Sequence, residues 1–368
     1  MYKIILQTKD FAGEFIEDEI KILTNQKIDY INDEFFSKNF KTTEELNEFV
    51  HKIAFQSRTV DRIYLEICNT KTKKISQETL TIFENKNLTF EIDSKTKKFD
   101  KKTTEIEFGN LIKENLNLEV NLKNYDLSFK IIDIEKETLC LLDLIGFDLS
   151  KREYKLNSDS MSINSSVSNY LFSLMNLDEE EEPFSIIDIS ANLGDLIIEA
   201  AIFNPRQNLN IRHKTKFPIY KLLKKLIPTP KTEDTKNKIL AVVQNNNTFK
   251  NLRENVNYSG QRIKISQFEF DWLDVKFQAQ EIDYVISQIP TFDTEKESLD
   301  YQDEFFYQAE FIVERLIGVV SKKPISKKPL EKYKLEIQEQ EEIFVGEQKY
   351  YIYVILPIGE PEEKEEKK

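Results

Sequence analysis

The stretch IIDISANLGDLIIEAA (Ile186–Ala201) decides the fold of the C-terminal half of the chain. It continues an apolar run, Phe184–Ile189, of the kind that a parallel sheet buries on both faces. A short turn around Gly194 follows, and apolar residues recur at helical spacing over Leu193–Ile202. A buried strand, a tight turn and a helix in this order predict one unit of a doubly wound α/β sheet.

The residues around this unit repeat the same alternation. The expected elements are helices at 165–176, 248–257 and 303–320, strands at 239–243, 263–270 and 282–286, and a strand pair at 335–340 and 350–356. Strands that alternate with helices indicate a doubly wound sheet, and we expect the closing pair to form its antiparallel edge. This pattern predicts an α/β domain at 156–358.

Residues 1–155 have a different rhythm. The expected elements are strands at 2–7 and 61–69, helices at 14–23, 43–55 and 105–116, and a strand pair within 120–144 that turns near Asn124 and Asp126. Thr42 or Thr43 is the expected cap of the second helix. The length of 368 residues also suggests two domains. We predict an α+β domain at 1–155 and a solvated, disordered tail of mixed acidic and basic residues at 359–368.

The net charge of the chain is -13, which argues against indiscriminate affinity for nucleic acids. It leaves room for a local basic patch on an acidic body. Residues 206–238 hold ten Lys or Arg against two acids and are the first candidate for such a patch. The chain has only 8 glycines, so few places allow the backbone to approach a phosphate or cofactor closely.

The two cysteines, Cys68 and Cys140, lie in apolar, strand-like runs. We expect them to be core thiols in a reducing compartment and not a disulfide. His51 and His213 lack the spacing of a zinc site, and no metal is expected. No apolar run approaches the roughly 20 residues of a membrane span. The N-terminus reads as a strand and not as a signal peptide, so we expect a soluble, cytoplasmic protein.

Four landmarks in this order resemble the archaeal THUMP-domain tRNA guanine-N2 methyltransferases. They are Ile4–Leu23, His51–Ile67, Val120–Leu156 with its junction Leu149–Tyr154, and Ile186–Ala201. Together they cover nearly the whole chain. The resemblance implies a ferredoxin-like plus THUMP RNA-binding domain followed by a Rossmann-like class I methyltransferase domain.

The resemblance also implies a crevice for S-adenosylmethionine at the carboxyl ends of the parallel strands. The family's acid after the first strand is kept as Asp188, and its two glycines fall at Asn192 and Gly194. Asn245 stands near the family's ribose-binding acid, and Asp271 stands where an acid reads the adenine amino group. Each position has a second reading: Asn192 in a turn that merely joins strand to helix, Asn245 as a helix cap, and Asp271 as a turn or cap residue.

The segment Asp283–Phe292 resembles the family's Asp-x-x-x-x-Asn-Pro-Pro-Tyr motif. In the family, the Asn oxygen and a Pro carbonyl accept hydrogen bonds from the target amine, and the aromatic ring stacks on the base. Here Gln288 replaces Asn, Ile289 replaces the first Pro, Pro290 is kept, and Phe292 is one position late. Since misplacement by about 1 Å can cost roughly 100-fold in rate, ordinary N2-methylation is not expected.

The basic insert Asn210–Lys231 interleaves cations with Phe217 and Tyr220, a pattern that suits phosphate contact and base stacking. The other reading is a solvated amphipathic helix that covers the sheet. By resemblance the 1–155 domain grips tRNA or another structured RNA. The candidate RNA contacts are Lys151, Arg152, Arg212, Lys214, Lys216, Lys221, Lys224 and Lys225.

The sequence therefore favours a tRNA-binding, catalytically silent or impaired homologue of these methyltransferases. The alternative is an active S-adenosylmethionine-dependent tRNA guanine-N2 methyltransferase with a divergent site. A metabolic Rossmann protein unrelated to RNA is a third reading, which the N-terminal domain disfavours.

Overall fold

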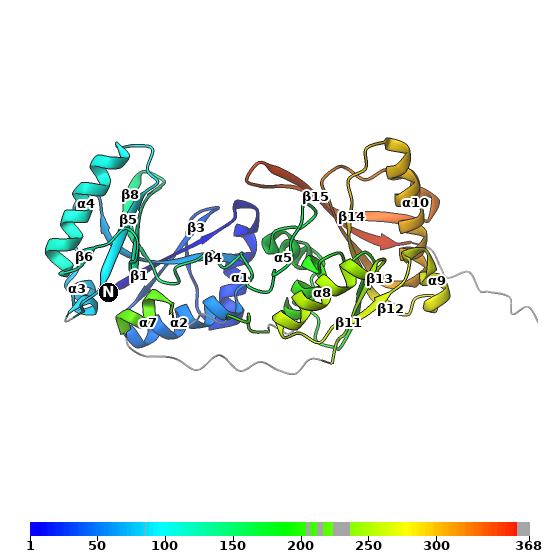
Figure 1. Cartoon of the computed structure of the whole chain (residues 1–368), viewed down its shortest axis with the longest axis horizontal. Coiled ribbons are helices and arrows are strands. Elements are labelled where there is room, and N and C mark those ends of the chain that lie inside the picture. Colours follow the sequence, from blue (N-terminus) through cyan, green and yellow to red (C-terminus); the bar gives the residue numbers. More distant parts are fainter. Residues whose placement is uncertain (85, 204–206, 212–215, 224–235, 359–368) are drawn as a thin grey trace, which may run out of the picture. The chain divides into compact units, whose positions relative to one another are not determined.

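The computed structural model describes the chain except for residues 85, 204–206, 212–215, 224–235 and 359–368 (Figure 1). The chain forms two compact units. The first comprises Met1–Lys151 and Ile211–Lys231, of which 211 and 216–223 are described, and the second comprises Arg152–Asn210 and Thr232–Lys368. The sequence had placed residues 216–223 in the second domain, whereas their apolar side chains pack in the first unit.

The first unit is built on an eight-stranded sheet with the order β2-β3-β1-β4-β8-β7-β5-β6. Its strands are β1 (Tyr2–Thr8), β2 (Asp29–Asn32), β3 (Phe35–Phe40), β4 (Val60–Asn69), β5 (Thr89–Ser94), β6 (Glu119–Val120), β7 (Leu127–Ile134) and β8 (Glu137–Asp143). Its helices are η1 (Asp10–Ala12), α1 (Gly13–Thr24), α2 (Thr43–Gln56), α3 (Gln77–Phe83), α4 (Lys101–Leu116) and α7 (Pro218–Leu223). Pairing is antiparallel except where β5 pairs with β6 and β7.

The expected hairpin within 120–144 turns at a different place. β7 and β8 join at Glu135 and Lys136, and Glu135 adopts a left-handed φ of 51°. The Asp126 carboxylate instead accepts a hydrogen bond from the Thr89 amide at 2.9 Å, so it fixes the start of β5. Thr42 caps α2 as expected, in a reciprocal capping box with Glu45.

Both cysteines are buried thiols, as predicted. Cys68 in β4 and Cys140 in β8 are directly paired residues across two antiparallel strands. Both side chains are at most 3% exposed, so they belong to the buried part of the sheet.

The second unit contains a seven-stranded sheet with the order β11-β10-β9-β12-β13-β15-β14. Its strands are β9 (Ser185–Asp188), β10 (Lys238–Val243), β11 (Lys264–Gln267), β12 (Ile282–Ile289), β13 (Val313–Ser321), β14 (Leu335–Val345) and β15 (Gln348–Pro357). Its helices are α5 (Ser165–Leu174), α6 (Asp195–Phe203), α8 (Asn246–Ser259), η3 (Phe270–Trp272), α9 (Leu273–Lys276), α10 (Glu295–Ile312) and α11 (Lys327–Lys332). The first five strands are parallel and β15 and β14 are antiparallel, which confirms the predicted doubly wound sheet with an antiparallel edge.

The predicted helix at 303–320 is wrong in its second half. α10 ends at Ile312, and β13 begins at Val313 without a connecting loop. Val313–Ser321 is rich in β-branched residues and pairs with β12 on one side and β15 on the other. A Cβ at Gly318 would lie 2.5 Å from Met175 Sδ, so the glycine lets the sheet approach this methionine just after α5. Within the described ranges, none of the helices combines the length and apolar character that a membrane crossing requires.

Candidate active-site crevice

Asp188 is the last residue of β9 and lies at the carboxyl edge of the parallel strands. It is buried, and its Oδ1 accepts a hydrogen bond from the Ser190 amide at 3.1 Å. Burial raises the pKa of the Asp188 carboxyl to about 8, and the nearby Asp195 adds to this effect. The group is therefore protonated at neutral pH and offers a neutral acid where the resemblance implies a carboxylate.

The turn after β9 is held by its own packing. Asn192 has a φ of 49° and Gly194 a φ of 92°, both in the left-handed region. A Cβ at Gly194 would lie 2.5 Å from Leu252 Cδ1 in α8 and 2.9 Å from Ile198 Cδ1 in α6. Side chains of the protein thus fill the space in front of this glycine, so the residue serves the close packing of the turn against Leu252 and Ile198. Leu193, which the sequence placed in the crevice or the core, is buried.

A small hollow lies between the ends of β9 and β10. Its lining comes from Ser190, Asn192, Val242, Val243, Gln244, Asn245 and Thr248. Its volume is about 60 Å³, whereas pockets for drug-sized ligands start at roughly 300 Å³. Asn245 is the N-cap of α8 and accepts the Thr248 amide at 2.9 Å, so this side chain is engaged as the helix cap.

Asp271 lies in the short helix η3 and is exposed. Its backbone carbonyl accepts a hydrogen bond from Gln308 Nε2 at 2.8 Å, which ties η3 to α10. The carboxylate faces solvent and is not among the residues that line the hollow.

The end of β12 carries the three residues of the predicted catalytic motif. Gln288 is 8% exposed, and its Nε2 donates to the Met161 carbonyl at 2.8 Å. Its Oε1 has no hydrogen-bond partner among the described residues. Pro290 follows the strand directly. Phe292 packs against the half-buried Tyr301 of α10, with ring centroids 5.1 Å apart, and is therefore held as part of a hydrophobic contact.

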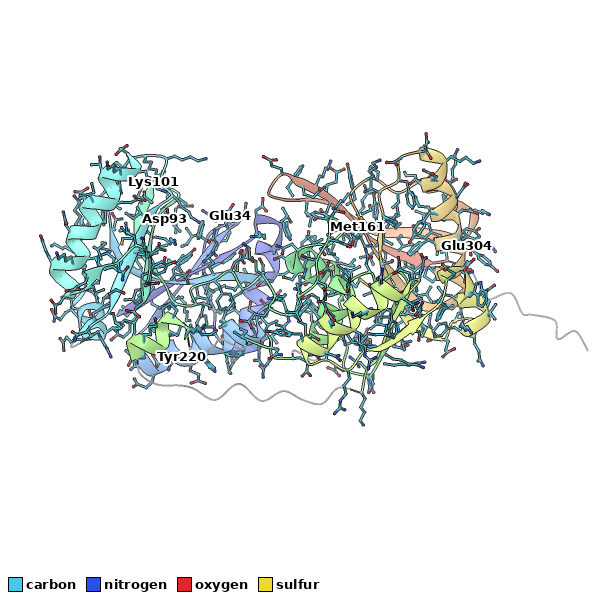
Figure 2. The ribbon with its side chains drawn as sticks, in the orientation of Figure 1. Glu34, Asp93, Lys101, Met161, Tyr220 and Glu304 are labelled. Carbon is cyan, nitrogen blue, oxygen red and sulfur yellow. The ribbon has the colours of Figure 1, made fainter. Side chains whose placement is uncertain are left out.

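Residues 157–163, which we call the crossing segment, run along the same edge of the sheet. Asn157 accepts from Asn255 of α8 at 3.0 Å, and the Ile163 amide donates to Asp195 at the start of α6 at 2.9 Å. Between them, Lys322 Nζ, just beyond β13, donates to the Ser160 carbonyl at 2.8 Å. Figure 2 labels Met161, the residue that binds Gln288. No local pattern predicted a role for this segment, because its contacts are with residues about 30 to 160 positions away.

The hollow at the ends of β9 and β10, as the described residues form it, lacks features that S-adenosylmethionine needs. A charged ribose acceptor is absent from the lining of the hollow, the acid of β9 is neutral, and the hollow is several-fold too small. Among the described residues, no three His, Cys, Asp or Glu side chains gather as a metal site would need.

Glu199 of α6 forms a buried ion pair with Arg152. Arg152 Nε donates to Glu199 Oε1 at 2.9 Å, and Arg152 is 8% exposed. Tyr154 Oη and Asn169 Nδ2 donate to the same carboxylate at 2.7 and 3.0 Å. Arg152 is thus a structural residue and is unavailable to RNA, which corrects its place among the candidate RNA contacts. Lys151, beside it, is exposed.

The described part of the basic insert packs in the first unit. Phe217, Ile219, Tyr220 and Leu222 are buried, and the Tyr220 hydroxyl lies 2.8 Å from His51 Nδ1. Lys221 pairs with Asp126 at 2.7 Å and is only about one-third exposed, so its charge is already neutralised. Lys216 is exposed. The remaining candidates, Arg212, Lys214, Lys224 and Lys225, lie outside the described residues.

The fold of the whole chain has close parallels among solved structures. TrmN from Thermus thermophilus aligns with a TM-score of 0.67 and 14% identity, over 97% of this chain and 100% of its own. A possible methylase from Clostridium difficile 630 aligns with a TM-score of 0.72 and 14% identity, over 98% and 99%. SMU.472, assigned as a methyltransferase and crystallised with SAH, aligns with a TM-score of 0.68 and 13% identity, over 96% and 97%.

No protein-family model and no curated protein sequence matches the chain. The similarity to the solved structures is one of fold, because all three share less than 15% of their residues with it. In fold, the chain is an N-terminal α+β unit followed by a Rossmann-like doubly wound unit, as the sequence predicted, and it shares this fold with the methyltransferase structures above.

Proposed function

We propose that this protein binds structured RNA, with tRNA as the first candidate, and is a catalytically silent homologue of the tRNA guanine-N2 methyltransferases. The observation that carries the proposal is the state of the crevice. The hollow at the ends of β9 and β10 holds about 60 Å³, and the crossing segment binds the side chain of Gln288. In this arrangement the second unit serves as a scaffold or a partner surface.

The nucleic-acid part of the proposal rests on the fold and on the resemblance of the sequence landmarks. The first unit carries its own eight-stranded sheet and helices, separate from the methyltransferase domain. A separate domain that precedes a methyltransferase domain is suited to hold a large substrate, since the small crevice itself offers few contacts. RNA of defined shape is the substrate class that the landmarks imply.

The second candidate is an active enzyme with a divergent site. Gln288 Oε1 is free to accept a hydrogen bond from an exocyclic amine, and Asp271 offers an exposed carboxylate. SMU.472, which shares the fold, was crystallised with SAH. Activity would require the crossing segment to move away from the carboxyl ends of the strands.

A thermal-shift titration separates the two candidates. Ligand present at about 100 times its Kd stabilises a fold by about 2.7 kcal/mol, which raises the Tm of a domain of this size by roughly 5 to 10 °C. We expect no shift with S-adenosylmethionine or S-adenosylhomocysteine at millimolar concentration. A reproducible upward shift, absent with adenosine monophosphate as control, supports the enzyme and refutes the silent homologue.

RNA binding is tested separately by gel shift or fluorescence anisotropy with total tRNA. Binding should weaken as salt rises, because counterions are released from the phosphates on binding. A chain that binds neither tRNA nor a structured RNA hairpin at low salt refutes the RNA-binding part, whatever the result with the methyl donor.

A further inference from the structure

Nine exposed lysines lie along one edge of the sheet of the first unit, where β4, β5 and β7 end and β8 begins. We call them the lysine edge: Lys71, Lys73 and Lys74 after β4; Lys95, Lys97 and Lys98 after β5; Lys101 and Lys102 in the first turn of α4; and Lys136 between β7 and β8. This concentration of cations stands out in a chain whose net charge is -13.

The three loops of the lysine edge are bound to one another. The Thr70 amide donates to the Thr138 carbonyl at 2.9 Å, and the Lys95 amide donates to the Ile131 carbonyl at 2.9 Å. Lys98 Nζ donates to the Glu135 carbonyl at 3.1 Å, and Lys73 pairs with Glu107 of α4. The lysines therefore form one continuous surface on a rigid sheet and not three independent loops.

Three of the nearby acids are engaged in local structure, whereas Glu135 and Glu137, on either side of Lys136, are exposed. Asp133 accepts hydrogen bonds from Thr96, from the Lys97 amide and from Thr138, at 2.6 to 2.9 Å. Asp100 caps α4 by accepting a hydrogen bond from the Thr103 amide at 2.8 Å. Asp93 pairs with Lys101 at 3.0 Å, and Figure 2 labels these two residues. Six lysines of the edge have no side-chain partner among the described residues: Lys71, Lys74, Lys95, Lys97, Lys102 and Lys136.

Two of the lysines stand where a helix disfavours them. Lys101 and Lys102 occupy the first turn of α4, where the helix macrodipole already carries positive charge. A polyanion at this place would relieve the repulsion and would also meet the helix N-terminus. Phe99 lies between the lysines of this segment and is 52% exposed, which provides a flat ring for a nucleobase.

We infer that the lysine edge is the surface that contacts the RNA backbone, with Phe99 as a stacking platform for an unpaired base. This inference rests on the proposed RNA-binding function and gives it a location. Cations spread over three loops match the spaced phosphates of a folded RNA, whereas a membrane would favour an apolar helix face, and a single exposed ring does not provide one.

The test compares two triple variants of the full chain. Lys95→Glu, Lys97→Glu and Lys102→Glu reverse three unpartnered charges on the edge. The matched control reverses three exposed lysines elsewhere in the same unit: Lys27→Glu, Lys41→Glu and Lys123→Glu. Both change the net charge equally. Binding of tRNA is measured by fluorescence anisotropy over a series of salt concentrations.

The edge variant should bind at least ~100-fold more weakly at low salt, and its salt slope should fall by about one per lysine that contacts a phosphate. Phe99→Ala should weaken binding roughly tenfold without a change of slope. The control should stay within about threefold of wild type. Should the edge variant not fold, as judged by circular dichroism, the milder changes Lys95→Gln, Lys97→Gln and Lys102→Gln replace it with the same expected direction.

Four outcomes overturn the inference or its basis. If wild type does not bind RNA, the proposed function fails. If wild type binds and the edge variant binds equally well, the inference fails while RNA binding stands. Equal loss in the control variant shows a general charge effect and also refutes it. Tighter binding to vesicles of phosphatidylserine or to an acidic peptide than to RNA would show that the partner class is wrong.

Discussion

Asp188→Asn should stabilise the second unit, and the gain should grow with pH. Burial raises the pKa of the Asp188 carboxyl from 3.8 to about 8, so the folded chain keeps a proton that the unfolded chain releases. The unfolded state then binds fewer protons, and wild-type stability falls as pH rises from about 4 through 8. Asparagine has no proton to lose, and its oxygen can still accept the Ser190 amide.

The magnitude follows from the two pKa values. One unit of difference corresponds to about 1.4 kcal/mol. At about pH 6, the pH lies about 2.2 units above the pKa of Asp188 in the unfolded chain. Keeping the proton on Asp188 then lowers the free energy of unfolding of the wild type by about 3 kcal/mol. Above about pH 9 the full difference applies, and the cost reaches about 6 kcal/mol. The gain of the variant should therefore double between these conditions.

Urea unfolding followed by tryptophan fluorescence measures this gain, since the single tryptophan, Trp272, belongs to the second unit. Glu281→Gln is the control: a hydrogen bond from the Gln278 amide and Lys238 lower the pKa of Glu281, so its effect is the same at both pH values. An Asp188→Asn gain that does not change with pH would refute the protonated state of Asp188.

Two further substitutions test the packing of the second unit, each by the same unfolding measurement. Gly194→Ala should cost about 3 kcal/mol or more, because its Cβ would meet Leu252 and Ile198. Gly260→Ala, at a φ of 75° with open space around it, should cost only about 1 to 2 kcal/mol. Equal costs would contradict the close packing of the turn at Gly194 against Leu252 and Ile198. Glu199→Gln should cost about 3 to 5 kcal/mol, because it leaves the Arg152 charge buried without its partner. Glu281→Gln breaks an exposed pair and should cost less than about 1 kcal/mol. A small cost for Glu199→Gln would show that Arg152 finds another acceptor.

Local sequence patterns predicted most elements of the second unit. The apolar run before Asp188 is β9, the polar cap at Asn245 begins α8, and the strand pair near the C-terminus is the antiparallel edge. Each of these depends on residues within about a dozen positions of one another. β13 was not predicted, because its apolar residues continue the helical spacing of α10. Hydrogen bonding to β12 and β15 favours a strand over a helix for these residues.

The candidate site was predicted only in part for the same reason. The positions of Asp188, Asn192, Gly194 and Gln288 at the strand ends follow from the motif order, but their surroundings do not. Leu252, which fills the space beside Gly194, lies 58 positions away from it in the sequence. Met161, which binds Gln288, lies 127 positions away from it. The buried pair of Arg152 with Glu199 spans 47 positions and removed a residue that the sequence had assigned to RNA.

The amino-acid sequence by itself determined the kind and order of most elements, the two-domain plan and the strand ends at which a site could form, because periodicity, caps and turns act between near neighbours. The tertiary structure alone decided which of those ends are filled, which charges are neutralised and which remain exposed. Lys221 and the lysine edge show this difference: both read as basic in sequence, but the acid beside Lys221 lies 95 positions away. Whether a charge is available to a partner depends on its neighbours in space, and these are set only when the chain has folded.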